Sequence, residues 1–288
     1  MLVGEGVDVT PALKQELWSA LSNLATMPAR HRTFTTLLEV IQNEPLRQAL
    51  RSYALVGPYG NLLDADHDSL GEASWQAFEM EGLMRSPALG PVLTNVFHRI
   101  EQRFGTTFRD DVTRKEQSRP TMLILDEAWL FLGNSTFSAK IREWLKTLRK
   151  KNVAVVFATQ SLSDVASSTI SESVLESCPT RIFLPNSRAD EPNFSQLYQS
   201  FGLNNQQITI LQQAIPKRDY YYQSPAGNRL FQLGLGSVGL AFSKGGSPEV
   251  QVAVPRILEE HGTDGFAAAY LREFAINAPA TSGEVKDE

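Results

Sequence analysis

One stretch near the middle of the chain constrains the fold more than any other. Residues 121–125 end in a run of large apolar side chains, and Asp126 and Glu127 follow it directly. A short apolar run bounded by turn signals, here Arg119-Pro120, is typical of a strand that a parallel sheet buries on both faces. Open α/β sheets bind ligands outside the carboxyl ends of their strands. The sequence therefore predicts a buried strand that ends in two carboxylates at a ligand-binding edge.

This acid pair has two interpretations. In P-loop NTPases, the first acid at this position, called Walker B, acts on Mg²⁺, and the second is available to orient the attacking water. The alternative is a pair of acids that only opens the next helix, because acids stabilise a helix N-terminus. The stretch by itself is compatible with both.

Composition excludes several classes of protein. The 288 residues suffice for one large or two modest domains, and a hydrophobic content of 42% is ordinary for a globular chain. The net charge of −5 gives no overall basic signature for nucleic acid. Cys178 is the single cysteine, which excludes an internal disulfide and suits a reducing compartment. The sequence shows no zinc-type His/Cys spacing, membrane-spanning apolar run or signal peptide.

Residues 8–53 predict a group of helices. Thr10-Pro11 is an N-cap followed by proline at the first helical position, a second helix is expected from Thr33, and a third from Pro45 to Tyr53. This segment carries no chemistry of its own. We interpret it as an all-α segment whose apolar stripes form ordinary core.

The next segment contains acids at alternate positions, Asp64, Asp66 and Asp68. The pattern resembles the start of a calcium loop, but Ser69 stands where such a loop needs glycine and Trp75 where it needs glutamate. We therefore predict a solvated acidic loop. Beyond it, the pattern predicts a strand at 74–80, a helix at 87–104 and a polar stretch at 105–119.

A strand–helix–strand unit follows. The strand at 121–125 precedes a helix at 138–150 with one apolar and one basic face, Asn152 ends that helix, and 153–160 predicts a second strand. Strands joined by a helix in this way are expected to be parallel neighbours. Their carboxyl ends meet at one edge of the sheet, so the side chain of Gln160 is expected close to the acid pair.

The remaining chain predicts further short elements. We expect a strand at 180–184, a helix at 204–214, antiparallel strands at 220–222, 229–235 and 238–242, and a helix at 258–274, and we expect the tail from Asn277 to be disordered.

The expected edge of the sheet carries the groups that phosphoryl transfer requires. Asp126 can serve Mg²⁺, Glu127 the attacking water, and Gln160 can sense the γ-phosphate. Arg149, at the end of the intervening helix, can reach a nucleotide in a neighbouring subunit as an arginine finger. The alternatives are a hydrogen-bonding residue at a strand end for Gln160 and a solvated capping charge for Arg149.

The run LILDEAWLFL, the helix ending LRKKN, and the segments VAVVFATQSLSDV and SCPTRIFLPN together resemble the C-terminal ATPase domain of TrbE/TraC-type conjugative transfer ATPases of type IV secretion systems. The resemblance extends upstream through YALVGPYGNLLDAD and downstream through FGLNNQQITILQQAIPKRDYYYQ, from about residue 8 to 275. It implies an α/β fold with a RecA-like P-loop NTPase core that contains part of a parallel sheet. An all-α subdomain segment would occupy 1–56, the core 57–275 with a small β-containing C-terminal segment, and a disordered tail 276–288.

The resemblance also implies a function. A member of this family is expected to hydrolyse ATP with Mg²⁺, held through water by Asp126, and to energise pilus assembly and the export of DNA or protein. It would work as a homo-oligomer, a hexamer, in the cytoplasm at the periphery of the bacterial inner membrane. Its partners would be other inner-membrane components and ATPases of the secretion system, and transferred DNA.

One departure from the family pattern is large. The sequence contains no Gly-x-x-x-x-Gly-Lys-Ser/Thr string, the loop whose amides and lysine hold the phosphates. We therefore interpret the chain as the C-terminal portion of a longer ATPase that hydrolyses ATP very poorly or not at all alone. The alternatives are a DNA translocase of the HerA/FtsK or coupling-protein type, and a catalytically silent fragment that acts only in assembly.

Overall fold

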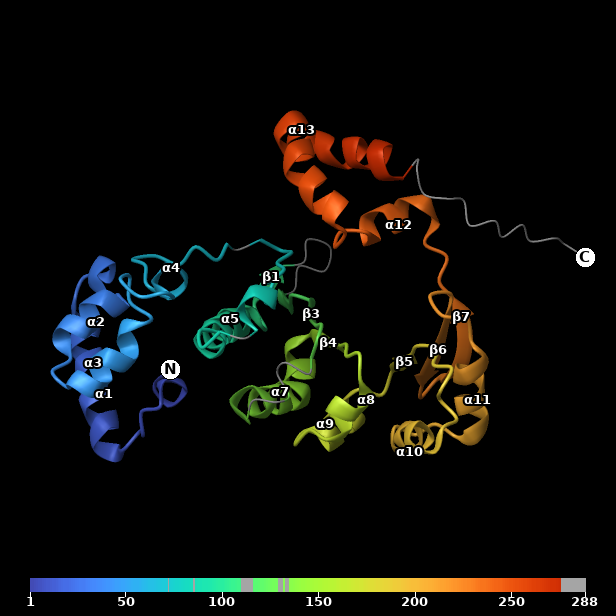
Figure 1. The fold of residues 1–288 in the computed structure, drawn as a ribbon, viewed down its shortest axis with the longest axis horizontal. Coiled ribbons are helices and arrows are strands. Elements are labelled where there is room, and N and C mark those ends of the chain that lie inside the picture. The colour runs from blue at the N-terminus through green and yellow to red at the C-terminus, as the bar shows by residue number, and fades with distance from the viewer. Residues whose placement is uncertain (72, 85, 110–115, 129–131, 133–134, 276–288) are drawn as a thin grey trace, which may run out of the picture. The chain divides into compact units, whose positions relative to one another are not determined.

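The computed structural model describes residues 1–288 except 72, 85, 110–115, 129–131, 133–134 and 276–288 (Figure 1). Contacts between residues divide the chain into two units, Met1–Ile170 and Ser171–Glu288. Trp129 and the tail for which we predict disorder lie outside the described residues. The boundaries at residues 56 and 275 stay a prediction.

The first unit begins with a group of short helices whose bounds are η1 Leu2–Glu5, α1 Pro11–Thr26, η2 Ala29–His31, α2 Phe34–Val40, α3 Glu44–Arg51 and α4 Gly60–Leu63. The side chains of Thr10 and Thr33 cap α1 and α2 by accepting bonds from backbone N–H groups three residues on, at 3.2 and 3.1 Å. The apolar faces pack into one core around Leu46 and Tyr53. The three helices predicted here are confirmed.

Asp64 corrects the prediction of a solvated acidic loop. Its side chain is buried, with 8% of the residue exposed. One carboxylate oxygen accepts from the backbone N–H of Phe34 at 2.6 Å, and the other accepts from the N–H groups of Thr35 and Leu55 at 2.9 and 2.8 Å. The Thr35 hydroxyl also donates to it. Asp64 therefore caps the N-terminus of α2 from about thirty residues downstream, while Asp66 and Asp68 are exposed.

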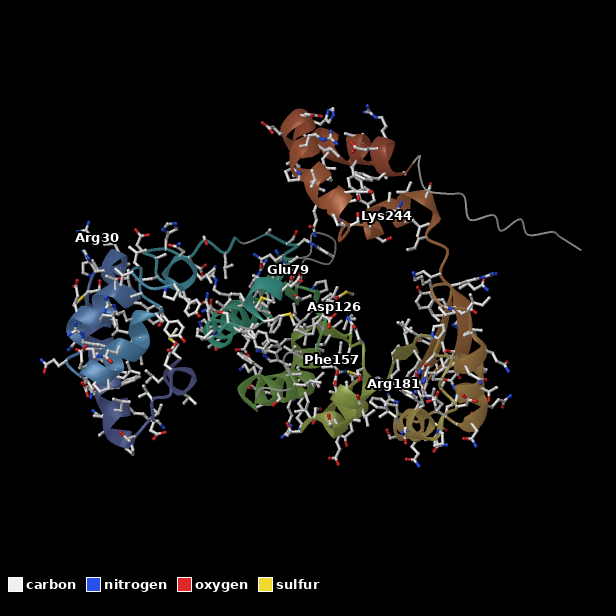
Figure 2. All side chains as sticks on the ribbon, viewed as in Figure 1. Arg30, Glu79, Asp126, Phe157, Arg181 and Lys244 are labelled. Carbon is white, nitrogen blue, oxygen red and sulfur yellow. The ribbon has the colours of Figure 1, made fainter. Side chains whose placement is uncertain are left out.

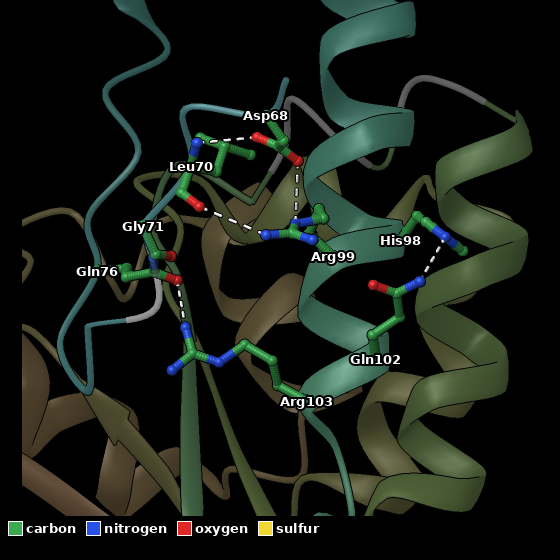
Figure 3. Close-up of polar contacts among 8 residues, drawn as sticks. All are labelled: Asp68, Leu70, Gly71, Gln76, His98, Arg99, Gln102 and Arg103. Atoms are coloured by element: carbon green, nitrogen blue, oxygen red, sulfur yellow. Dashed lines mark hydrogen bonds and ion pairs between the residues drawn. The ribbon is translucent and has the colours of Figure 1, made fainter. Parts of the chain in front are cut away.

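Two arginines of one helix, Arg99 and Arg103, bind the loop that follows α4 (Figure 3). This part contains η3 Glu81–Leu83 and α5 Leu89–Arg103. Arg99 pairs with the carboxylate of Asp68 at 3.1 Å, and Arg103 donates to the backbone carbonyl of Ala73 at 2.8 Å. The prediction of a strand at 74–80 is wrong. No described strand pairs with this segment; instead, the Arg103 guanidinium donates to the Ala73 carbonyl and to the Gln76 side chain.

An aromatic cluster joins α5 to α7 (Ser135–Thr147). The Trp144 ring lies 4.6 Å from that of Phe97, which in turn meets Phe137 edge-on at 5.4 Å. Glu101 accepts a hydrogen bond from the indole N–H of Trp144 at 2.7 Å and forms an ion pair with Lys140 at 2.6 Å. The helix predicted at 138–150 is thus confirmed as α7, which begins and ends three residues earlier and is extended by the 3₁₀ turn η4 (Leu148–Lys151).

A two-stranded parallel sheet forms the centre of this unit. The bounds are β1 Thr107–Arg109, β2 Glu116–Ser118, β3 Thr121–Leu125, β4 Val153–Phe157 and α8 Leu162–Ala166. β3 pairs with β4 in parallel, from Thr121 opposite Val153 to Leu125 opposite Phe157, as predicted. Asn152 ends η4 in the left-handed conformation at φ 57°. The antiparallel pair β1–β2 is not predicted by the polar sequence at 105–119.

The prediction that β3 is buried on both faces is wrong. Leu123 and Leu125 are buried, whereas Met122 and Ile124 are 65% and 51% exposed. β4 shows the same asymmetry, because Val153 is buried and Val156 is 43% exposed. Successive side chains of a strand point to opposite faces, so the described residues cover one face of the β3–β4 sheet and leave the other bare.

The second unit combines an antiparallel sheet with helices, whose bounds are α9 Ser171–Ser177, β5 Arg181–Phe183, α10 Pro192–Ser200, α11 Asn205–Gln213, β6 Asp219–Ser224, β7 Gly227–Gln232, α12 Gly236–Ser243 and α13 Pro248–Phe274. The sheet has the order β5-β6-β7. Asn204 and Gln207 form a capping box at the start of α11. The helix predicted at 204–214 and the strands at 180–184 and 220–222 are confirmed, and the strand predicted at 229–235 is confirmed in part by β7.

The segment 238–242, predicted as a strand, is helical in α12. Its Ala241 is buried against α13, and the Tyr270 hydroxyl donates to the Ala241 carbonyl at 2.9 Å. A short apolar run does not by itself distinguish a strand from a helix, and in this structure the run forms part of a helix. α13 starts ten residues before the predicted helix and is interrupted at Gly262, where φ is 64°.

Candidate functional site

The carboxyl ends of β3 and β4 lie side by side, and backbone hydrogen bonds continue beyond the strands. The N–H of Ala158 donates to the carbonyl of Leu125 at 2.9 Å, and the N–H of Ala128 donates to the carbonyl of Ala158 at 2.9 Å. These bonds hold the segment that follows β3 against the segment that follows β4. Figure 2 labels Asp126 and Phe157, at the ends of the two strands. The residues after each strand are therefore placed together by the sheet itself.

The structure brings Glu127 of the acid pair into contact with Gln160, as the sequence predicts. The side-chain amide of Gln160 donates to a carboxylate oxygen of Glu127 at 2.5 Å. The backbone N–H of Glu127 donates to the carboxylate of Asp126 at 3.0 Å. Asp126 and Gln160 are exposed and Glu127 is half-buried, so all three are accessible to a ligand at the sheet edge.

Glu127 has an unusual backbone conformation. Its φ of 50° lies in the left-handed region, which residues other than glycine, asparagine and aspartate seldom adopt. Such a conformation costs on the order of 1 kcal/mol or more and persists where the surroundings impose it. Here the bonds of Ala128 and Ala158 impose it on a turn that directs the Glu127 carboxylate toward Gln160.

Two hydroxyl groups beside Gln160 were not among the predicted site residues. Ser161 and Ser163 lie 2.6 Å apart, oxygen to oxygen, and the Thr159 hydroxyl donates to the carbonyl of Ser161 at 3.2 Å. They surround the start of α8, and their alternate spacing directly after a strand-end glutamine is the signal that could have identified them. They add neutral donors and acceptors to the same edge.

The structure does not bring Arg149 to this site. Arg149 lies in η4, which precedes the amino end of β4, whereas the acid pair follows the carboxyl end of β3. Its side chain is exposed and borders an open hollow of about 500 Å³, which Pro120, Met122 and Ala154 also line. Within one copy of the chain, Arg149 and Glu127 therefore occupy opposite ends of the sheet.

The donor set fits a magnesium–nucleotide complex in part. Mg²⁺ is usually held by one or two carboxylates together with phosphate oxygens and water, and Asp126 offers an exposed carboxylate for this purpose. Among the residues that the structure describes, no group of three or more histidine, cysteine or acidic side chains could hold a metal alone. The phosphates would have to complete the coordination, and the sequence has no P-loop string to hold them.

Comparison with known proteins identifies the family. The profile of the TraG P-loop domain matches residues 38–223. The chain belongs to this family. Residues 38–223 contain Asp126, Glu127 and Gln160, so the site lies within the TraG P-loop domain.

Individual relatives are similar over most of the chain. Conjugal transfer protein TrbE of Rhizobium radiobacter is 43% identical over 265 residues, which cover 91% of this chain and 31% of the relative. A probable conjugal transfer protein of Sinorhizobium fredii, named as the second piece of a TrbE, is 43% identical over 245 residues, 84% of this chain and 35% of the relative. This TraG-family chain therefore spans about a third of the length of the curated relatives that it matches.

A solved structure supports the fold. VirB4 of Thermoanaerobacter pseudethanolicus superposes with a TM-score of 0.55 at 16% sequence identity, over 79% of this chain and 65% of that one. The fold is thus a RecA-like α/β P-loop NTPase fold, as predicted. None of the described helices combines the length and the apolar character that crossing a bilayer requires.

Proposed function

We propose that this chain is part of an ATP-hydrolysing motor that energises type IV secretion and conjugative transfer. The observation that carries the proposal is the contact between Glu127 and Gln160 beside Asp126, at the carboxyl edge of a parallel sheet. This edge is where α/β sheets bind ligands. Membership of the TraG P-loop domain family and the conjugal transfer function named for the TrbE relatives support the same conclusion.

Each residue of the site has a proposed role in phosphoryl transfer. Asp126 would hold Mg²⁺ through water, and the bound ion would supply charge that stabilises the phosphate oxygens. Glu127 orients the attacking water, and Gln160 contacts the γ-phosphate or, as in this structure, the Glu127 carboxylate. Arg149 acts on a nucleotide held by a neighbouring copy in a hexamer, which is consistent with its place at the opposite end of the sheet.

The names of the relatives support the proposed partners. Proteins named VirB4 and TrbE are components of type IV secretion and conjugal transfer systems. We propose that this chain works in the cytoplasm at the periphery of the bacterial inner membrane, with other components and ATPases of the secretion system. Pilus assembly and the export of DNA or protein would be the work that the motor performs, and transferred DNA is a further proposed partner.

The phosphate-binding loop is expected in the portion of the motor that this chain does not span. Without its amides and lysine, most donors to the phosphates are missing. The Sinorhizobium relative, of which this chain covers 35%, is itself named as the second part of a TrbE. We therefore expect the 288-residue chain alone to hydrolyse ATP very poorly or not at all.

The test compares hydrolysis by the chain alone with hydrolysis by a single polypeptide that joins it to the remaining portion of the Rhizobium radiobacter relative. The joined protein should hydrolyse ATP, and Glu127→Gln should lower kcat about 100-fold or more, because a positioned base contributes about 10²–10⁴ in rate. Glu143→Gln, which changes an exposed glutamate of α7, is the matched control and should leave kcat unchanged.

Two outcomes would contradict the proposal. Robust hydrolysis by the isolated chain that disappears with Glu127→Gln would show that the chain needs no further phosphate-binding loop. A joined protein that neither binds an ATP analogue with Mg²⁺ in calorimetry nor hydrolyses ATP would leave only a role in assembly.

A further inference from the structure

The antiparallel sheet β5–β6–β7 of the second unit has one covered and one accessible face. Residues that pair across strands share a face. Phe183 and Tyr221 are such a pair, both are buried, and Tyr198 of α10 meets the Phe183 ring edge-on at 6.1 Å. The next pair, Ile182 and Tyr222, lies on the opposite face, where Ile182 is 56% exposed. Among the described residues, α10 therefore covers one face, and the other stays accessible.

The accessible face of β6 and β7 carries aromatic rings and a guanidinium group. Tyr220 pairs with Phe231, and Tyr222 pairs with Arg229. The rings of Tyr220 and Phe231 are stacked, with centroids 5.5 Å apart at an angle of 25°. The Arg229 guanidinium lies 5.9 Å from the centre of the Tyr222 ring. The three rings are half-buried and Arg229 is exposed, and we call these four residues the aromatic face.

The surroundings of the aromatic face are positively charged, although the chain as a whole carries a net charge of −5. Between Glu191 and Glu249 the sequence contains one acid, Asp219, and this residue is buried, with 5% of its surface exposed. Lys217 and Arg218, which come directly before β6, are both exposed. The exposed charges of this segment are therefore all cationic.

The arginines beside the rings are available to an anion. Arg218 donates to the side-chain oxygen of Gln232 at 3.2 Å, and in the part of the chain that the structure describes neither Arg218 nor Arg229 pairs with a carboxylate. Arg188 of the same unit differs, because it donates two hydrogen bonds of 2.7 Å to the carboxylate of Glu191. The aromatic face thus combines flat rings with uncompensated positive charge.

We propose that the aromatic face binds a single strand of nucleic acid, with bases stacked on its rings and phosphates held by Arg218 and Arg229. Proteins that bind single strands without sequence preference combine a positively charged surface with aromatic side chains on which bases stack. Rings on the open face of an antiparallel sheet serve this purpose in RNA-binding domains.

The spacing of the rings favours a single strand over a duplex. The pair of Tyr220 and Phe231 lies two residues from Tyr222 along β6, which is about 7 Å. That distance is twice the rise of about 3.4 Å per nucleotide of a duplex strand. The bases of a duplex are also stacked on one another, so the rings cannot reach them. An extended single strand can place one base on each row of the face.

An anionic membrane surface fits the aromatic face less well. Cations beside apolar groups also suit anionic lipids, but such contacts bury large apolar side chains among the headgroups. The turn between β6 and β7 offers Pro225 and Ala226, which are both small. The rings lie instead on the face of the sheet, where Tyr220 and Phe231 pack against each other. This arrangement suits stacking on a base.

The inference rests on the proposed function for the source of the strand, because a conjugative motor offers transferred DNA. It goes further by assigning the surface that holds the strand, in the unit that does not contain Asp126 and Glu127. Stacking and phosphate contacts require no nucleotide hydrolysis. The 288-residue chain alone is therefore expected to bind.

The first experiment measures the affinity of the chain for a fluorescein-labelled oligothymidylate of about 20 nucleotides, by fluorescence anisotropy in about 50 mM salt. Tyr222→Leu should weaken binding about tenfold, because it removes one stacking ring. Phe194→Leu is the matched control, since Phe194 is also half-buried and its ring also lies below an arginine, Arg188, at 5.0 Å. This control should leave the affinity unchanged.

The second experiment tests the charge. Arg229→Gln should weaken binding and lower the slope of log K against log salt by about 0.7, the value for one phosphate contact to a single strand. Arg188→Gln is the matched control, because the charge of Arg188 is already balanced by Glu191. Its salt slope should equal that of the parent chain. Far-UV circular dichroism checks that all four variants keep their secondary structure.

Four results would overturn the inference. The first is no binding of the oligothymidylate in about 50 mM salt. The second is equal affinity of Tyr222→Leu and the parent chain, which would leave no role for the ring. The third is a duplex of the same length bound as tightly as the single strand. The fourth is sedimentation with phosphatidylglycerol vesicles that Tyr222→Leu abolishes while oligothymidylate binding persists, which would assign the face to lipid.

The two proposals can fail separately. Binding that depends on Tyr222 and Arg229, in a chain whose joined form hydrolyses no ATP, would retain the aromatic face and reject the motor. Hydrolysis by the joined protein together with no binding of the oligothymidylate would retain the motor and reject the aromatic face.

Discussion

Asp64 and Glu127 show two different uses of a carboxylate in one chain. Asp64 is 8% exposed and accepts bonds from three backbone N–H groups and one hydroxyl. Glu127 is half-buried at an open edge, where its carboxylate accepts from the amide of Gln160. Both acids follow an apolar run in the sequence. Asp64 links the start of α2 to the residues after α3, whereas Glu127 lies at the open edge of the sheet.

Burial and the type of hydrogen-bond donor distinguish a structural acid from a candidate functional acid. A buried carboxylate whose acceptor positions are taken by the backbone has no capacity left for a ligand, and its removal leaves buried donors unpaired. An accessible carboxylate held by a flexible amide can exchange that partner for water or a metal-bound ligand. Glu101 lies between the two, since it is partly buried and bound by the side chains of Lys140 and Trp144.

Asp64→Ala should have the largest effect on stability. It leaves three backbone donors and the Thr35 hydroxyl without their acceptor, and a buried hydrogen bond to a charged group contributes about 1.5–3 kcal/mol. We expect a loss of about 3 kcal/mol, measured by urea unfolding of the helical segment. Asp68→Ala removes an exposed acid of the same loop and should cost less than about 1 kcal/mol. Equal losses would refute the distinction.

Glu101→Gln should have an intermediate effect. The amide oxygen can still accept from the Trp144 indole, but the ion pair with Lys140 is lost. We expect a loss of about 1–2 kcal/mol at neutral pH, because the bond is charge-assisted and both side chains are about 30% exposed, at 27% and 31%. Thermal unfolding measures it. A variant as stable as the parent chain would show that the pair contributes nothing.

The same pair predicts a pH dependence. Burial raises the pKa of Glu101, but the hydrogen bonds from Lys140 and Trp144 and the charge of Lys140 outweigh it, so the pKa lies below its ordinary value of 4.5. A lowered native pKa contributes stability that is present above the ordinary value and is lost as the pH falls through the native pKa. The stability difference between parent and Glu101→Gln should therefore shrink below pH 4.5. A constant difference down to pH 3 would contradict this assignment.

Glu127→Gln should have the smallest effect on stability, within about 0.5 kcal/mol, as is usual for an accessible side chain. The glutamine keeps an acceptor for the Gln160 amide and loses only the charge. Thermal unfolding of the isolated chain measures the effect apart from any hydrolysis. A loss comparable to that of Asp64→Ala would place Glu127 among the structural acids.

Much of the local structure could be predicted from the sequence. Thr10 and Thr33 cap the two helices that the sequence predicts to begin at these residues, and the two apolar runs form parallel strands. These signals are local, because a cap acts over three residues and a strand needs only its own side-chain pattern. The contact of Glu127 with Gln160 was predictable too, since parallel strands end at one edge.

The remainder depends on contacts that sequence spacing does not show. The burial of Asp64 rests on donors at Phe34 and Thr35, about thirty residues away. The failure of the strand at 74–80 depends on Arg103, which lies in a later helix. The exposure of Met122, Ile124 and Val156 was not predicted, because an apolar strand is typical of burial on both sides and the described residues leave one side of this sheet open. The roles of Asp126, Glu127, Arg149 and Gln160 stay predictions.

The turn at Asn152 determines which residue after β4 lies opposite Glu127. The Asn152 side chain donates to the Ser118 carbonyl at 2.9 Å, and the Ser118 hydroxyl donates to the Lys151 carbonyl at 3.0 Å. These two hydrogen bonds fix the start of β4 relative to the residues before β3. A shift of one residue in the pairing of β4 with β3 would extend along the whole strand and place Thr159 or Ser161, in place of Gln160, opposite Glu127. The identity of the residue that meets the acid is thus decided at the far end of the sheet. A deletion in η4 that spares Arg149 would change the chemistry without touching any proposed site residue.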